Sequence, residues 1–187
     1  MSHSREVQRR STRLEGYDYS QPGAYFVTVC TKNKTHILSN VEGERVILFP
    51  IGKMIEGCWL GIPDHFLNVE LDKWIIMPNH FHGIIFLHDS RRGEAFVANL
   101  NQMKLKTANA SPVQHPKGTP SGSLSAIVQN FKSISTRTVN HFQGTPGIPI
   151  WQRGYYDRII RNDKELDRIR RYIEENPLKW ELDPYHV

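Results

Sequence analysis

The chain has 187 residues, of which 39% are hydrophobic and 23% charged, values that suit one soluble domain with a buried core. No run approaches the ~20 apolar residues of a membrane span, the arginine-rich N-terminus lacks a signal-peptide core, and two cysteines do not make a disulfide framework. The net charge of +5 and the pI of about 9.3 favour polyanionic partners, and the reduced thiols predict a cytoplasmic protein.

The N-terminal half predicts an arm, a strand, a helix and a hairpin. Residues 1 to about 22 are rich in arginine and end in a turn signal, so we expect an irregular basic arm there. The β-branched and aromatic run 25–31 predicts a strand, and apolar side chains at helical spacing predict a helix over 51–60. Segments 69–76 and 80–87 predict two antiparallel strands around a tight connection, Met77-Pro78-Asn79.

The C-terminal half begins with a polar stretch, from about 89 to 123, that predicts a flexible loop or insertion. Helical spacing resumes over 124–142, and 150–160 reads as a strand or extended segment. Asn162 and Glu165 resemble a capping box for a last helix, which we expect to run to residue 175 or 176 because Pro177 stops it. This order predicts an α+β, ferredoxin-like antiparallel sheet with helices packed on it, within a single domain over 1–187.

His80 and His82 form the sharpest local motif. Successive strand residues alternate faces, so both imidazoles point the same way while Phe81 points into packing. Two imidazoles about 7 Å apart at Cβ can converge on one metal ion. The plainer alternative, a pair of satisfied or exposed histidines, is favoured by the motif taken alone.

Tyr172 and Asn176 form a second motif in the last helix. They are four residues apart and therefore lie on one helical face, at the flank of the apolar stripe formed by Leu166, Ile169 and Ile173. A tyrosine at such an edge can pack its ring and leave its hydroxyl accessible. The alternative is an interfacial tyrosine with a purely structural role.

The two motifs together suit phosphodiester chemistry. A phenol with a pKa near 10 is a poor nucleophile at neutral pH, but a divalent metal can polarise a phosphodiester and stabilise charge on its oxygens. Asn176 is placed to add an oxygen ligand to His80 and His82. This mixed nitrogen and oxygen set suits Mg²⁺ or Mn²⁺, and no Gly-rich phosphate loop points to a nucleotide cofactor.

Several blocks in this order resemble the REP-associated tyrosine transposases, relatives of small insertion-sequence transposases that cut single strands with one tyrosine. The resemblance covers most of the chain, through the blocks 13–19, 23–28, 74–84, 131–133, 151–161 and 172–177. It implies a ferredoxin-like fold and a bacterial, nucleoid-associated protein that cuts single-stranded DNA next to imperfect hairpins. It also implies a 5′-phosphotyrosyl intermediate and a free 3′-hydroxyl, in a monomer or a homodimer.

The resemblance assigns residues as well. Tyr172 matches the nucleophile, and His80 and His82 match the metal ligands. Insertion-sequence relatives often place glutamine one turn after the tyrosine, so the shorter Asn176 leaves that metal contact open. The arm is expected to help recognise the hairpin, and the candidate DNA contacts are Arg9, Arg10, Arg13, Lys132 and Arg153.

Other functions remain open at this stage. A domesticated protein could bind DNA hairpins without cutting them, and a metal-dependent phosphohydrolase or an RNA-binding ferredoxin-like domain would share parts of the pattern. Tyr155 and Tyr156 are competing tyrosines, but they sit in an extended segment without an amide four residues on. The joint presence of a histidine pair, a tyrosine and an amide favours the enzyme, because binding alone requires neither metal ligands nor a nucleophile.

Overall fold

The computed structural model describes Leu14 and residues 16–89 and 120–186 of the chain. The first part of the predicted arm, with Arg9, Arg10 and Arg13, and most of the predicted insertion lie outside these described residues. None of the helices among the described residues has the length and hydrophobicity of a membrane span.

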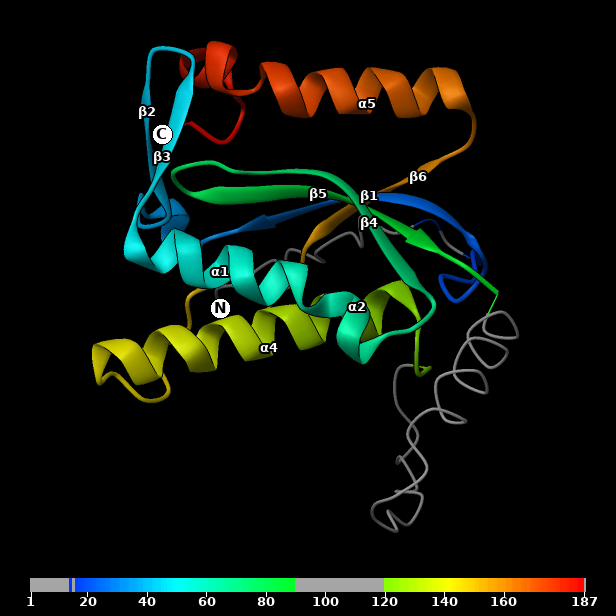
Figure 1. The fold of residues 1–187 in the computed structure, drawn as a ribbon, viewed down its shortest axis with the longest axis horizontal. Coiled ribbons are helices and arrows are strands. Elements are labelled where there is room, and N and C mark those ends of the chain that lie inside the picture. Colours follow the sequence, from blue (N-terminus) through cyan, green and yellow to red (C-terminus); the bar gives the residue numbers. More distant parts are fainter. Residues whose placement is uncertain (1–13, 15, 90–119, 187) are drawn as a thin grey trace, which may run out of the picture.

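A four-stranded antiparallel sheet forms the centre of the fold (Figure 1). Its strands are β1 (Gly23–Cys30), β4 (Val69–Ile76), β5 (His80–Leu87) and β6 (Tyr156–Ile160). The spatial order is β4-β5-β1-β6, and every neighbouring pair is antiparallel. With a helix after the first strand and another after the third, this is the predicted ferredoxin-like α+β arrangement.

Helices cover both faces of the sheet. They are α1 (Pro50–Leu60), α2 (Ile62–His65), α4 (Leu124–Gln143) and α5 (Asp163–Glu175), with short 3₁₀ turns η1 (Lys32–Lys34) and η2 (Pro177–Leu182). Figure 1 shows α5 on one side of the sheet and α1, α2 and α4 on the other. The strand alternation therefore divides each strand's side chains between two separate apolar clusters.

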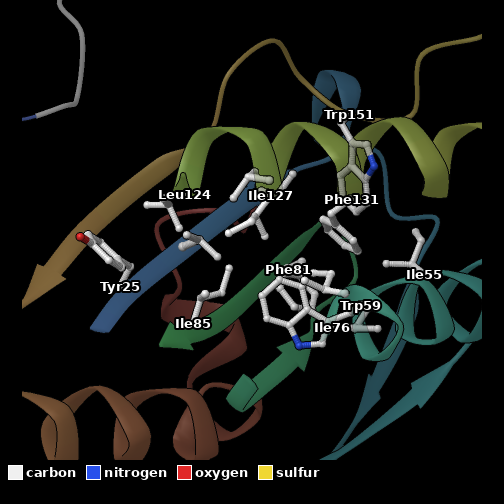
Figure 2. Close-up of a cluster of buried hydrophobic side chains, with 14 of the residues drawn as sticks. Tyr25, Ile55, Trp59, Ile76, Phe81, Ile85, Leu124, Ile127, Phe131 and Trp151 are labelled. Carbon is white, nitrogen blue, oxygen red and sulfur yellow. The ribbon is translucent and has the colours of Figure 1, made fainter. Parts of the chain in front are cut away.

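The larger cluster lies between the sheet and α1 and α4 (Figure 2). Trp59 is fully buried in this cluster, and its ring centroid lies 4.4 Å from that of Phe81 and 5.4 Å from that of Phe131. Gly83 makes this packing possible, because a Cβ there would lie 2.5 Å from the Trp59 ring. A strand residue with any side chain at that position would displace the indole.

The smaller cluster joins α5 to the opposite face of the sheet. Ile169 and Ile173 pack there against Ala24, Ile84 and Ile160. The predicted cap is confirmed, since Oδ1 of Asn162 accepts a hydrogen bond from the backbone N–H of Glu165 at 2.9 Å. The apolar stripe and the cap together hold α5 at a defined position over β1 and β5.

Three features differ from the sequence-based expectations. A two-stranded hairpin of β2 (Ser39–Glu42) and β3 (Arg45–Leu48) was not predicted, because strands of four residues carry too little periodic signal. Only 156–160 of the predicted segment 150–160 belongs to the sheet, with a single bridge from Trp151 to Thr31. Pro177 ends α5 as predicted, but the chain continues as a 3₁₀ turn, in which proline occupies a tolerated first position.

Candidate metal and tyrosine site

His80 and His82 lie on the face of β5 that α5 covers. Their antiparallel partners on β1 are Cys30 and Thr28, and their ring centroids are 4.5 Å apart. Both side chains are almost fully buried, at 0% and 1% exposure. Burying two imidazoles removes them from water, so their hydrogen-bond partners decide what they can do.

His80 presents an unused lone pair. Its Nδ1 lies 2.9 Å from Oδ1 of Asn79, which can only accept, so Nδ1 carries the hydrogen. The Asn79 amide is oriented because its Nδ2 donates to the carbonyl of Tyr185 at 2.8 Å. Nε2 of His80 has no hydrogen-bond partner among the described residues, although it is buried. Burial lowers the pKa of His80 to about 4, so the ring is neutral at neutral pH, as a metal ligand must be.

His82 connects β1 to the tyrosine of α5. Its Nδ1 lies 2.8 Å from the hydroxyl of Thr28, and its Nε2 lies 3.3 Å from the hydroxyl of Tyr172. The tautomer with Nδ1–H donating to Thr28 leaves Nε2 to accept from the phenol, and it satisfies both contacts. Burial, and secondly the neighbouring His80, hold the pKa of His82 well below its usual value.

Tyr172 sits at the flank of the apolar face of α5, as its spacing predicted. Its ring makes edge contacts with Phe26, at 6.0 Å between centroids, and with His82, at 5.3 Å. The side chain is still 37% exposed, so the hydroxyl lies between the buried histidines and solvent. Burial and then the charge of Asp183 raise the pKa of Tyr172 to about 12. The phenol therefore remains protonated at neutral pH.

Asp183 joins the histidines, and sequence reasoning missed it. One ligand atom from each of His80, His82 and Asp183 can be chosen so that all three lie within 4.8 Å of one another. Asp183 is 7% exposed and its Oδ2 accepts from Nδ2 of Asn176 at 2.9 Å. It lies beyond the proline that ends α5 and has no periodic relation to either motif, so no local signal marks it.

Asn176 lies inside the same cluster rather than at the surface. Its side chain is 2% exposed, and its Oδ1 is buried without a hydrogen-bond partner among the described residues. Its Nδ2 is engaged with Asp183. The amide thus orients the carboxylate and retains an oxygen with an unused acceptor capacity.

The C-terminal segment closes the histidines off from solvent. The ring of Tyr185 lies 4.7 Å from that of His80 and 5.8 Å from that of His82, between centroids. Trp180 of η2 packs 6.0 Å from His80. The C-terminal segment of the chain therefore buries the two histidines.

The other predicted residues lie elsewhere. Nζ of Lys132 donates to the carbonyl of Gln152 at 2.7 Å and to that of Gly154, and so holds the segment that carries the exposed Arg153. Of the competing tyrosines, Tyr155 donates to Ser125 at 3.4 Å. The ring centroid of Tyr156 lies 6.0 Å from that of Tyr185, the residue that covers the two histidines.

No protein-family model matches the chain. The chain is 35% identical over 179 residues to an uncharacterized protein of Haemophilus influenzae strain Rd, a match that spans 96% of this chain and 93% of that protein. Among solved structures, it resembles a REP-associated tyrosine transposase bound to a REP hairpin, with a TM-score of 0.54 and 19% identity, over 88% of this chain and 72% of the other. The chain thus belongs to one family with the Haemophilus influenzae protein and has the fold of the REP-associated tyrosine transposases.

Proposed function

We propose that this protein is a metal-dependent transesterase that cuts, and can rejoin, single-stranded DNA next to hairpins, with Tyr172 as its nucleophile. The observation that carries the proposal is the 3.3 Å contact between the Tyr172 hydroxyl and Nε2 of His82. It joins two sequence motifs that lie 90 residues apart. Burying polar groups costs free energy, so hydrophobic packing alone does not explain why these groups are buried together.

The cluster suits a divalent cation. Nε2 of His80 and Oδ1 of Asn176 are buried acceptors without described partners, and Asp183 adds a carboxylate beside them. Buried acceptors beside a carboxylate are what a cation requires, and a mixed nitrogen and oxygen set suits Mg²⁺ or Mn²⁺. The residues that would hold the ion are His80, His82 and Asp183, with Asn176 as a further oxygen donor. When bound, a divalent cation would polarise a phosphodiester and stabilise negative charge on its oxygens.

In the proposed reaction the Tyr172 oxygen forms a bond to phosphorus, and the bond from phosphorus to the 3′-oxygen of the preceding nucleotide breaks. The phenol loses its proton, and the departing oxygen takes one up to become a 3′-hydroxyl. The chain is left joined to the 5′-phosphate through tyrosine. Because the phosphotyrosine conserves the energy of the phosphodiester, attack by a 3′-hydroxyl can restore a DNA strand without ATP.

The Tyr172 phenol must be deprotonated to act as a nucleophile. With its pKa raised to about 12, only roughly one Tyr172 in 10⁵ is ionised at pH 7. Asp183 contributes to this rise, so a positive charge beside the carboxylate would lower the pKa of the phenol again. Activity is therefore expected only with a divalent cation. Access of a phosphodiester to the histidines also requires the Tyr185 ring to move aside, since that ring covers both.

The substrate class is supported by fold and charge. The solved transposase with this fold is bound to a REP hairpin, and this chain carries a formal charge of +5. The phosphate backbone supplies much of the affinity of any such complex, so a basic protein is suited to it.

Covalent trapping tests the proposal. A hairpin oligonucleotide with a single-stranded flank is incubated with the protein and Mn²⁺, and the adduct is resolved by denaturing electrophoresis. The adduct is expected to form with the unmodified protein, to disappear with EDTA, and to be absent in Tyr172→Phe, which should bind the hairpin as before. Tyr156→Phe is the matched control, because Tyr156 is a similarly exposed tyrosine at 46% that contacts neither histidine in the described structure. An adduct that still forms with Tyr172→Phe would refute the assignment of Tyr172 as the nucleophile. Hairpin binding by the unmodified protein without any adduct would refute the transesterase and indicate a protein that only binds DNA.

A further inference from the structure

One face of α5 carries a row of exposed cations, here called the basic stripe: Arg161, Lys164, Arg168 and Arg171. Arg161 precedes the helix cap, and the other three are spaced by four and three residues. At 100° per residue, these three fall within an arc of about 60° on the solvent side of α5. The stripe is therefore a property of the folded helix and follows its axis.

Most acidic residues of α5 are paired with cations. Glu175 lies within the arc of the stripe, at its C-terminal end, and it binds Lys179 at 2.6 Å. Arg170 binds Asp72 of β4 at 2.7 Å, and Glu174 binds Lys73 at 2.7 Å, so this side of the helix is neutralised against the sheet. The pattern that looks evenly mixed in sequence thus separates into a paired face and a basic face.

Glu165 lies beside the stripe, near its N-terminal end, and it is already engaged. It binds Arg158 at 2.7 Å and accepts from the backbone N–H of Arg161 at 3.0 Å, while its contact to Arg168 is longer, at 3.7 Å. Within residues 14, 16–89 and 120–186, neither Lys164 nor the Arg161 guanidinium has a carboxylate within 4.0 Å. The stripe keeps an uncompensated positive charge.

The stripe runs between two aromatic side chains. Arg168 lies one helical turn before Tyr172, so their side chains are neighbours on the helix surface. At the other end lies a cavity of about 400 Å³. Its lining comprises Tyr19, the cations Arg158 and Arg161, the acids Asp157 and Glu165, and the apolar Leu14 and Ile159. From Asp163 to Tyr172 the helix rises about 13.5 Å, which spans roughly four phosphate spacings of about 3.4 Å along one stacked strand. A basic track with aromatic rings is the usual surface for single-stranded nucleic acid.

We propose that the basic stripe binds the single strand of DNA next to the scissile phosphate, with phosphates along the stripe and a base in the cavity beside Tyr19. The inference rests on the proposed function, because it takes Tyr172 as the point of attack. It assigns strand binding to α5 itself, which is a role separate from the candidate DNA contacts that the sequence suggested in the arm and at Lys132 and Arg153.

The test compares two double variants with equal loss of charge, both in a Tyr172→Phe background that cannot cleave. Arg168→Gln with Arg171→Gln removes two cations of the stripe. Lys53→Gln with Arg137→Gln, the control, removes two exposed cations from α1 and α4 across the sheet. Fluorescence anisotropy measures binding of a hairpin with a single-stranded flank, and of the same hairpin without it, between 50 and 200 mM NaCl.

The stripe variant is expected to lower the slope of log K against log salt by about 1.4, since each single-strand phosphate contact contributes about 0.7. At 0.1 M salt this is roughly a 25-fold weaker complex, and only with the flanked hairpin. An unchanged slope, or an equal loss in the control, would overturn the inference. Equal loss with the unflanked hairpin would overturn it too, because the stripe would then bind duplex.

Failure of the proposed function gives a different result. If the unmodified protein formed no adduct but the stripe variant lost flank binding as expected, the nucleophile would be wrong and the stripe would stand. If the adduct formed through Tyr172 while the slope stayed unchanged, the stripe alone would be refuted. Circular dichroism of both double variants should show the unmodified fold, since all four substituted side chains are exposed.

Discussion

Thr28→Val should weaken metal binding at the candidate site and also lower the stability of the fold. Thr28 faces His82 across the β1–β5 pairing, is 2% exposed, and places its hydroxyl 2.8 Å from Nδ1 of the imidazole. Valine keeps the shape of the side chain but cannot accept the hydrogen. An unpaired buried Nδ1–H costs about 1–3 kcal/mol in the free energy of unfolding. The imidazole also loses the partner that fixes its tautomer, and such losses weaken metal binding by roughly 10–100-fold.

Isothermal titration with Mn²⁺ measures the affinity, and thermal unfolding of the metal-free protein measures the stability. Ser135→Ala is the matched control, because Oγ of Ser135 accepts from the ring N–H of Trp151 at 2.9 Å, on the opposite face of the sheet. It should lose a similar stability and bind Mn²⁺ normally. Unchanged Mn²⁺ affinity in Thr28→Val, or an equal loss of affinity in Ser135→Ala, would refute the role given to His82.

Two further substitutions test the site and the core that supports it. Asp183→Asn should weaken Mn²⁺ binding by at least the roughly 10–100-fold that is typical when a residue supporting a metal ligand is lost. The control is Glu181→Gln, an exposed position in the same C-terminal segment, which should leave the Mn²⁺ titration unchanged. Equal Mn²⁺ affinities of the two variants would remove Asp183 from the set of metal ligands. Gly83→Ala should lower the free energy of unfolding by about 1–3 kcal/mol, because its Cβ would lie 2.5 Å from the buried Trp59 ring. Gly57→Ala on α1 meets nothing within 4 Å and should be neutral or stabilising in the same denaturant titration, and a stable Gly83→Ala would show that the indole can move.

Elements with a strong periodic signal were predicted closely. The bounds of β4 and β5 agree with the predicted segments 69–76 and 80–87, and Asn162 caps α5 as its side chain indicated. The alternation of β5 also placed both histidines on one face correctly, because strand geometry repeats every two residues whatever surrounds it. Local rules were sufficient wherever one element alone determined the direction of a side chain.

The charges of α5 show where local rules ended. Acids and bases are interleaved along this helix, so the sequence alone does not determine which of its charges are paired. The ion pairs of Arg170 with Asp72, and of Glu174 with Lys73, decide which charges are neutralised, and both partners belong to β4, about 100 residues earlier in the chain. Only the docking of α5 on the sheet reveals the basic stripe.

The sequence by itself determined the residue types of the chemistry: an oriented histidine pair on a strand, and a tyrosine with an amide one turn later on a helix. Tertiary structure decided that these meet, because packing of Ile169 and Ile173 against the sheet brings the Tyr172 hydroxyl to His82. It also decided that Asp183 joins them. Contacts between distant segments depend on how the chain returns upon itself, and burial, which sets the protonation of these groups, exists only once it has done so.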